Sequence, residues 1–245
     1  MGIDPPGIAG CSAGPLAAGQ RTRLIPQDVL PAPSLILEAG IELIENGQLA
    51  DALAVSGIRV AEGLLLGGFL GVALGTAVGL SRWFEATVDP PMQVIRALPH
   101  LGLIPLFILW FGIGELPKVL LVALGVSFPL YLNTFSAIRQ VDPKLFETAQ
   151  VLGFTFWQRF RTIIVPSAAP QVLVGVRQSL AIAWLTLIVA EQINADKGIG
   201  FLINNARDFL RIDIIIFGLI VYALVGIGTD AIVRTLERRA LRYRS

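Results

Sequence analysis

Residues 64–80 read Leu-Leu-Leu-Gly-Gly-Phe-Leu-Gly-Val-Ala-Leu-Gly-Thr-Ala-Val-Gly-Leu, a stretch of 17 residues without a charged side chain. Its nine Leu, Phe and Val residues contribute about −3 to −5 kcal/mol to membrane insertion, which offsets the cost of the glycines. A helix of this length is just long enough to cross the hydrocarbon core of a bilayer. The stretch therefore predicts a transmembrane helix.

The composition of the whole chain supports the same class. Of the 245 residues, 54% are hydrophobic and 15% are charged, and the mean hydropathy is +0.71, far more apolar than a soluble domain. A net charge of +1 gives no overall basic character of the kind that indicates nucleic-acid binding. One cysteine and one histidine leave little room for a disulfide framework, a zinc site or a Ser-His-Asp triad. We therefore expect no catalytic residue, metal or cofactor in this chain.

Four further segments are apolar enough to span a bilayer or nearly so. They cover residues 98–113, 119–138, 170–193 and 214–232. The first of these is short and contains Pro99 and Pro105, so we expect a bent helix packed among others. The pattern predicts an all-α, polytopic membrane protein with about five transmembrane helices and no separate soluble domain.

The distribution of lysine and arginine predicts the orientation, because cytoplasmic loops are enriched in both. The loop at 139–166 and the C-terminal tail carry clusters of basic residues. The connection at 112–118 has only Lys118, and the one at 194–213 balances its three basic residues with three aspartates. We therefore expect a cytoplasmic C-terminus and an external N-terminus. The expected parts are a disordered tail at 1–29, an external pre-membrane segment at 30–56, a transmembrane domain at 57–235 and a cytoplasmic basic tail at 236–245.

The 139–166 loop has the pattern of two short helices joined at a glycine. Asp142 is a good N-cap for the first helix, and Gly153 is a good stop for it. Thr155 and Gln158 have the spacing of a capping box for the second helix, which we expect Pro166 to end. Such a hinged element suits docking into the groove of a partner, and an ordinary amphipathic loop is the alternative.

The loop resembles the signature of the membrane-spanning subunits of bacterial ABC importers: Glu-Ala-Ala, a glycine and a later Ile-x-Leu-Pro. The matching residues are Glu147, Thr148, Ala149, Gly153, Ile163, Val165 and Pro166, with Thr148 and Val165 as departures. The resemblance implies that Glu147 contacts the ATPase or caps the docking helix and that Ala149 permits close approach. It also implies that Gly153 sets the hinge and that Pro166 ends the second helix.

The resemblance extends through about residues 30 to 240. In detail, the chain is most similar to the permease subunits of aliphatic-sulfonate importers. The runs that carry it are Arg96-Ala97-Leu98-Pro99-His100, residues 104–112 with Trp110-Phe111-Gly112, residues 185–191 with Ala190-Glu191, and Asn205-Ala206-Arg207-Asp208-Phe209-Leu210. Permeases for taurine and nitrate share the Trp-Phe-Gly and Ala-Glu elements. They share the Pro99-His100 and Asn205-Ala206-Arg207 elements less often, so the resemblance implies aliphatic sulfonates as the substrate, with taurine, nitrate or another small anion as the alternative.

The resemblance implies a type I ABC importer permease fold in the bacterial inner membrane. It also implies a homodimer, separate ATPase subunits that bind the ATP, and a periplasmic or lipid-anchored substrate-binding protein. The chain has no Gly-x-x-x-x-Gly-Lys-Ser/Thr loop, which agrees with a separate ATPase. Family members often carry one more helix before residue 30, and a natural five-helix form, a divergent start or a wrongly chosen start codon would each explain the difference. A membrane scaffold or an intramembrane enzyme is the alternative from another class.

A strip of glycines lies in the first span. Gly67, Gly71, Gly75 and Gly79 recur every four residues and form a flat helix face that another helix can approach closely. The strip predicts a packing seam, either one that moves during transport or one that is purely structural.

Several polar residues in or near the spans are candidates for the translocation pathway, because a charge in hydrocarbon is costly unless it faces water or a partner. The candidates are Arg96, His100, Ser179, Trp184, Thr186 and Glu191. Arg96 and His100 are four residues apart and can share a helix face, although snorkelling of Arg96 and packing of His100 is the alternative. Arg177 and Glu191 lie too far apart in one helix to pair, so we expect each to anchor its own interface.

Overall fold

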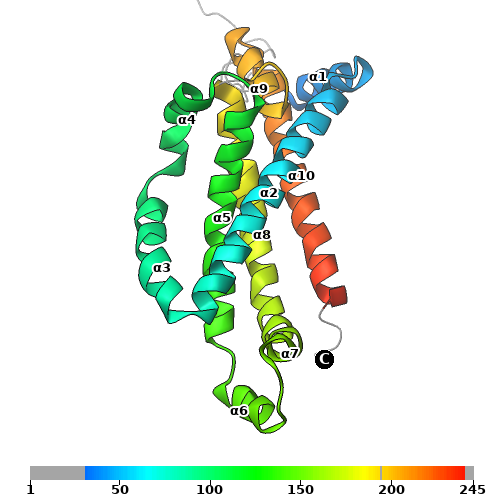
Figure 1. Ribbon diagram of the computed structural model, residues 1–245. Coiled ribbons are helices and arrows are strands. Elements are labelled where there is room, and N and C mark those ends of the chain that lie inside the picture. The colour runs from blue at the N-terminus through cyan, green and yellow to red at the C-terminus, as the bar shows by residue number, and fades with distance from the viewer. Residues whose placement is uncertain (1–30, 194, 241–245) are drawn as a thin grey trace, which may run out of the picture.

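A computed structural model of the protein describes residues 31–193 and 195–240 (Figure 1). The predicted tail at 1–29 lies outside the described residues, as does the end of the basic tail. The described segments are α-helical except for one 3₁₀ and one π-helical turn. In chain order they are α1 (Pro33–Glu45), α2 (Gln48–Leu80), α3 (Arg82–Ala97), η1 (His100–Leu103), α4 (Ile104–Phe111), α5 (Glu115–Arg139), α6 (Pro143–Val151), α7 (Phe156–Arg159), η2 (Phe160–Ile164), α8 (Val165–Ile193), α9 (Ile199–Asp208) and α10 (Ile212–Ala240).

Four long helices form the bundle and are long and apolar enough to cross a membrane: α2, α5, the continuous helix that ends in α8, and α10. Figure 1 shows that α2 and α5 run in the same direction, while α8 runs back between them and α10. The α3–α4 segment therefore has to return the chain from one end of the bundle to the other. Counting this bent pair as one span gives five, as the sequence predicts.

The return segment differs from its predicted form. Instead of one bent helix at 98–113, the chain forms α3 before it and α4 within it, and the two halves are bent by 84°. The break lies at Leu98, whose extended backbone is the conformation that a following proline favours. The helix α4 then ends at Gly112, which has φ +80°. The predicted bounds of 98–113 were wrong because the first half of the return segment is α3, which lies before residue 98 and has a polar face.

The first span also begins earlier than the apolar window suggests. The helix α2 starts at Gln48, just after Gly47 in the left-handed conformation, and runs for 33 residues. The segment expected before the membrane at 30–56 thus contains α1 and the first turns of α2. Ser56 and Arg59 lie on the α2 helix and are buried, although they precede the charge-free stretch.

The glycine strip packs directly against α5. A Cβ atom added to Gly71 would lie 2.5 Å from the backbone oxygen of Ser127, and one added to Gly75 would lie 2.6 Å from that of Tyr131. Helix backbones can approach this closely only where side chains are absent. The strip thus lies at an α2–α5 contact within one chain, and Gly63 extends this contact by one more turn.

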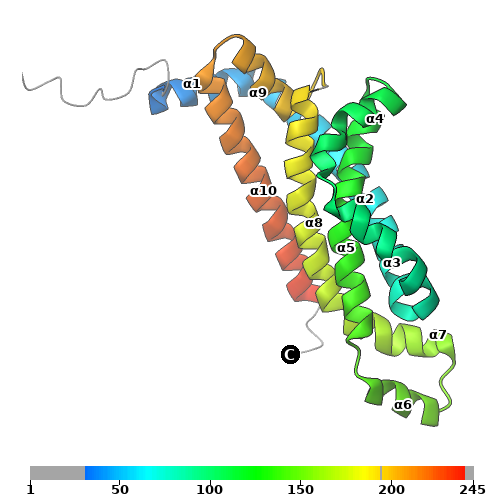
Figure 2. The same cartoon turned by 90° about the vertical axis from the view of Figure 1, so that its left-hand side faces the viewer.

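The apolar core lies where α2, α5 and α8 meet. Its fully buried members include Val122 and Val126 of α5 with Ala183 and Leu187 of α8. By contrast, α10 is the least buried of the four long helices, and Figure 2 shows it leaning away from the bundle at one end. The core therefore holds α2, α5 and α8 together, and the loops at both ends of the bundle connect to these helices.

Candidate functional site

The α6–α7 loop projects from one end of the bundle, opposite α9 (Figure 2). Its local structure follows the sequence: the Asp142 side chain accepts a hydrogen bond from the Lys144 backbone N–H at 2.9 Å. Thr155 and Gln158 form the predicted capping box at the start of α7. Gly153 has φ +72°, a conformation that glycine adopts at little cost. The two short helices and the glycine turn between them are confirmed.

The faces of this loop differ in exposure. Ala149 is buried, whereas Glu147 and Thr148 beside it are exposed, and the Thr148 hydroxyl donates to the Lys144 carbonyl at 2.8 Å. Large apolar side chains on either side of Gly153 are also exposed, among them Val151 at 88% and Trp157 at 65%. An apolar surface of this kind beyond the end of a bundle is typical of a docking site for another protein.

Pro166 does not end the second helix. The chain passes from α7 through the π-helical turn η2 into α8 without a break, and Pro166 is the second residue of α8. A proline disrupts a helix by removing one backbone hydrogen bond and by crowding the preceding turn, and the wider π turn takes up both effects. Ile163 is half-buried in η2 and Val165 is exposed at the start of α8. The loop is therefore continuous with a long span.

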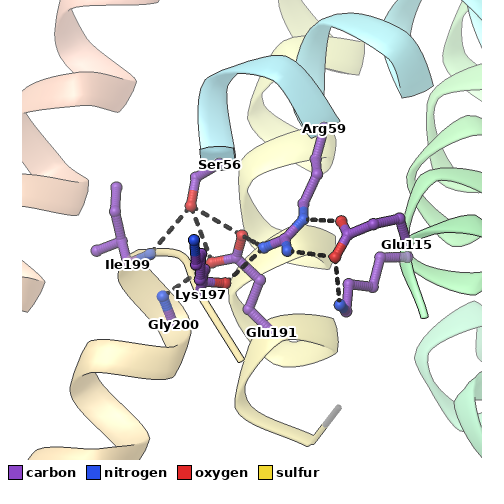
Figure 3. Close-up of polar contacts among 8 residues, drawn as sticks. Ser56, Arg59, Glu115, Glu191, Lys197, Ile199 and Gly200 are labelled. Atoms are coloured by element: carbon purple, nitrogen blue, oxygen red, sulfur yellow. Dashed lines mark hydrogen bonds and ion pairs between the residues drawn. The ribbon is translucent and has the colours of Figure 1, made fainter. Parts of the chain in front are cut away.

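A network of charged and polar groups, most of them buried, lies near the other end of the bundle, beside α9 (Figure 3). We call it the mouth network. It contains Ser56, Arg59, Glu115, Lys118 and Glu191, from α2, α5 and α8. The Arg59 Nη1 atom donates to Glu191 Oε1 at 2.6 Å, and the Ser56 hydroxyl donates to both Glu191 oxygens at 2.8 and 3.0 Å. Arg59 also binds Glu115 through two nitrogens, one of them Nη2 to Oε1 at 2.7 Å.

The mouth network also holds the loop between α8 and α9. Arg59 Nη1 donates to the Lys197 carbonyl at 2.7 Å, and the Gly200 N–H donates to Glu191 Oε2 at 2.9 Å. Gly198 has φ +118°, and a Cβ atom there would overlap the Glu191 carboxylate. Because the Arg59 and Glu191 side chains are only 4% and 0% exposed, these bonds replace the water that both charges would otherwise require.

The sequence predicts only one member of this network as a candidate. Glu191 is among the predicted pathway residues. Ser56 lies in the segment assigned to the exterior, and Arg59 lies within the predicted transmembrane domain but before its charge-free stretch, so neither is a candidate. The available signal is the spacing of Leu49, Leu53 and Val60, which continues the helical pattern of α2 upstream of the apolar window. A charge on the inward face of such a helix indicates a buried partner.

The remaining pathway candidates lie at different depths. His100 Nε2 and Thr186 Oγ1 are 3.1 Å apart, and Gly125 of α5 leaves room for the pair. The Ser179 hydroxyl donates to the Val126 carbonyl at 2.8 Å, and Trp184 packs edge-on against Tyr222. Ser179, Trp184, Thr186 and Glu191 are buried within the bundle. Their role in lining a pathway stays a prediction.

Arg96 and His100 do not share a helix face. Arg96 is exposed in the last turn of α3, and the break at Leu98 places His100 in η1. Arg177 pairs with Asp230 of α10 at 3.0 Å. It does not pair with Glu191, because the two residues lie too far apart along α8. Glu191 binds Arg59 of α2, so these two charges connect α8 to different helices.

Residues 63–242 match the family described as the inner membrane component of binding-protein-dependent transport systems. The chain belongs to this family. Two relatives carry the name aliphatic sulfonates transport permease protein SsuC. The one from Bacillus subtilis (strain 168) is 47% identical over 89% of this chain and 79% of its own length. The one from Escherichia coli (strain K12) is 46% identical over 88% of this chain and 82% of its own length.

A further relative of this permease is the taurine transport system permease protein TauC of Escherichia coli (strain K12). It is 33% identical over 89% of this chain and 81% of its own length. Among solved structures, the crystal structure of an amino acid ABC transporter with histidines matches with a TM-score of 0.64. It is 18% identical and covers 81% of this permease and 96% of the matched chain. The permease therefore has the type I ABC importer permease fold and is embedded in a membrane.

Proposed function

We propose that this permease imports aliphatic sulfonates and couples their passage to ATP hydrolysis in separate ATPase subunits. The observation that carries the substrate class is the identity of 46–47% to two sulfonate permeases, against 33% to a taurine permease. In each of the two sulfonate permeases, nearly half of the aligned residues are identical to those of this chain. That difference favours alkanesulfonates over taurine.

The proposed assembly contains two copies of the permease, two ATPase subunits and a substrate-binding protein. The α6–α7 loop supports the ATPase contact, because it presents exposed apolar side chains on two short helices held by a glycine turn. Closure of the ATPases would move the two loops together and tilt α8, which is continuous with α7 through η2. Such rocking would open the pathway to alternate sides of the membrane.

The proposed orientation places the α6–α7 end in the cytoplasm and the α9 end outside. The α6–α7 loop and the end of α10 carry most of the basic residues that flank spans, which supports this assignment. The binding protein then approaches the α9 end. In this arrangement, the mouth network lies where substrate arrives.

Growth on a defined sulfur source tests the substrate class. The host should lack its own sulfonate permease and keep its sulfonate-binding protein and ATPase, and this gene should be supplied on a plasmid. We expect the gene to restore growth on butanesulfonate as sole sulfur source, with sulfate growth unaffected. Restored growth on taurine alone, or uptake of nitrate alone, would replace sulfonate as the substrate. A failure on all three anions, with the protein present in the membrane, would contradict the transport proposal.

A further inference from the structure

The mouth network holds two buried cations against one accessible carboxylate. The side chains of Arg59 and Lys118 are each 4% exposed, whereas that of Glu115 is 63% exposed. Glu115 Oε1 accepts from Arg59 Nη2 at 2.7 Å and from Lys118 Nζ at 3.0 Å, and its other oxygen accepts from Arg59 Nε. A forked guanidinium together with an ammonium group is an arrangement that proteins use to bind oxyanions.

The two carboxylates of the network are held in different ways. Glu191 is closed off from solvent and accepts bonds from Ser56, Arg59 and the Gly200 backbone. Glu115 accepts side-chain bonds only from Arg59 and Lys118 among the described residues. Glu191 is therefore a fixed counter-ion, and Glu115 is one that another anion can replace.

The backbone before Glu115 gives it room to turn away. Glu115 is the first residue of α5, and Gly112 and Gly114 precede it. A Cβ atom added to either glycine would meet nothing within 4 Å, so this connection is not packed against the bundle. Rotation of the Glu115 side chain toward solvent would leave the packing of α5 intact.

The charges favour replacement by a monoanion. With Glu115 in place, Arg59 and Lys118 are balanced by Glu115 and Glu191. With Glu115 turned away, one positive charge is left uncompensated in a buried position, which is costly. A bound sulfonate restores the balance with one negative charge, and the N-terminus of α5 adds a favourable helix dipole.

We propose that Arg59 and Lys118 form an oxyanion site that receives the sulfonate group of the substrate. In this structure, Glu115 occupies the site in place of the ligand. The exposed apolar residues Ile113 and Leu116, on either side of Glu115 in the sequence, suit contact with an alkyl chain. The inference rests on the proposed function and adds to it the first residues that substrate meets in the permease.

Direct binding to the full-length permease tests this site without its partners. Calorimetry in lipid nanodiscs should compare wild type with Glu115→Gln, with butanesulfonate as the probe at constant ionic strength. We expect Glu115→Gln to bind butanesulfonate at least tenfold more tightly, because the competing carboxylate is gone. The double variant Glu115→Gln/Lys118→Met should lose that gain. Glu62→Gln, which removes an exposed acidic charge from α2, is the matched control and should bind like wild type.

Three outcomes would overturn the site. They are equal affinity of wild type and Glu115→Gln, an equal gain in Glu62→Gln, and a gain that survives loss of Lys118. If Glu115→Gln does not fold, Glu115→Asp replaces it, and we expect a smaller gain because the shorter carboxylate contacts the two cations less well.

Wild-type uptake in the assembled transporter is measured separately. Normal sulfonate uptake with unchanged binding in the variants contradicts only this site, whereas absent uptake contradicts the proposed function.

Discussion

The Arg59–Glu191 and Arg139–Glu85 ion pairs differ mainly in their access to water. Arg59 and Glu191 are buried and joined to Ser56 and the α8–α9 loop, whereas Arg139 and Glu85 are partly exposed. An exposed pair contributes little because water solvates both charges when they separate. Removal of one partner of a buried pair leaves the other without compensation. The same chemistry therefore has different consequences at the two sites.

We expect Glu191→Gln to lower the free energy of unfolding by about 3–5 kcal/mol, because Arg59 loses a charged partner that water cannot replace. The control Glu85→Gln should lower it by less than about 1 kcal/mol. Denaturant titration of both purified variants in detergent measures the difference. Equal losses would show that burial of the Arg59–Glu191 pair has no special energetic weight.

The glycine strip of α2 determines how closely α2 and α5 can pack. In Gly71→Ala, the new methyl group would lie 2.5 Å from the Ser127 oxygen, so α2 and α5 must separate. We expect a loss of about 1–3 kcal/mol in unfolding free energy. In Gly68→Ala, the nearest atom is Leu130 Cδ1 at 3.4 Å, an ordinary contact, and stability should be unchanged or higher. Thermal unfolding of the two variants should separate them, and equal melting temperatures would contradict the seam.

The α6–α7 unit depends on the left-handed turn at Gly153. Valine at this position would bear a strain of about 1–3 kcal/mol, which lowers the population of the docked conformation by about 5-fold to 150-fold. We expect Gly153→Val to insert normally and to lose copurification with the ATPase and uptake together. Asparagine tolerates positive φ, so Gly153→Asn should keep most of both. Normal uptake by Gly153→Val would remove the turn from the coupling mechanism.

With the bent α3–α4 pair counted as one span, the described residues cross the membrane five times, and the two ends of the bundle lie on opposite sides. Glu45 ends α1 near α9, and Val151 lies in the α6–α7 loop. In a Cys11→Ser background, we expect an impermeant maleimide to label Glu45→Cys in intact spheroplasts. It should label Val151→Cys only after permeabilisation. The reverse pattern would invert the proposed orientation and place the mouth network in the cytoplasm.

The sequence alone was sufficient for the features that depend on local patterns. Apolar length predicts the spans around 64–80, 119–138, 170–193 and 214–232, because a bilayer requires long uninterrupted helices. Capping residues and Gly153 predict the two short helices of the loop, because their hydrogen bonds join residues two to four positions apart. The glycine strip predicts close packing, because a flat face is a property of one helix.

Which distant residues meet depends on how the helices pack in three dimensions. Arg59 and Glu191 are 132 positions apart, and no local pattern indicates that α2 brings an arginine beside α8. The charge-free stretch at 64–80 does not reveal that α2 begins at Gln48. The first turns of α2 can contain charged residues because partners on other helices neutralise them. Likewise, Pro166 predicts a helix end, but the π turn before it absorbs the disruption. Spans and caps follow from the preferences of neighbouring residues, whereas the mouth network depends on the packing of three helices.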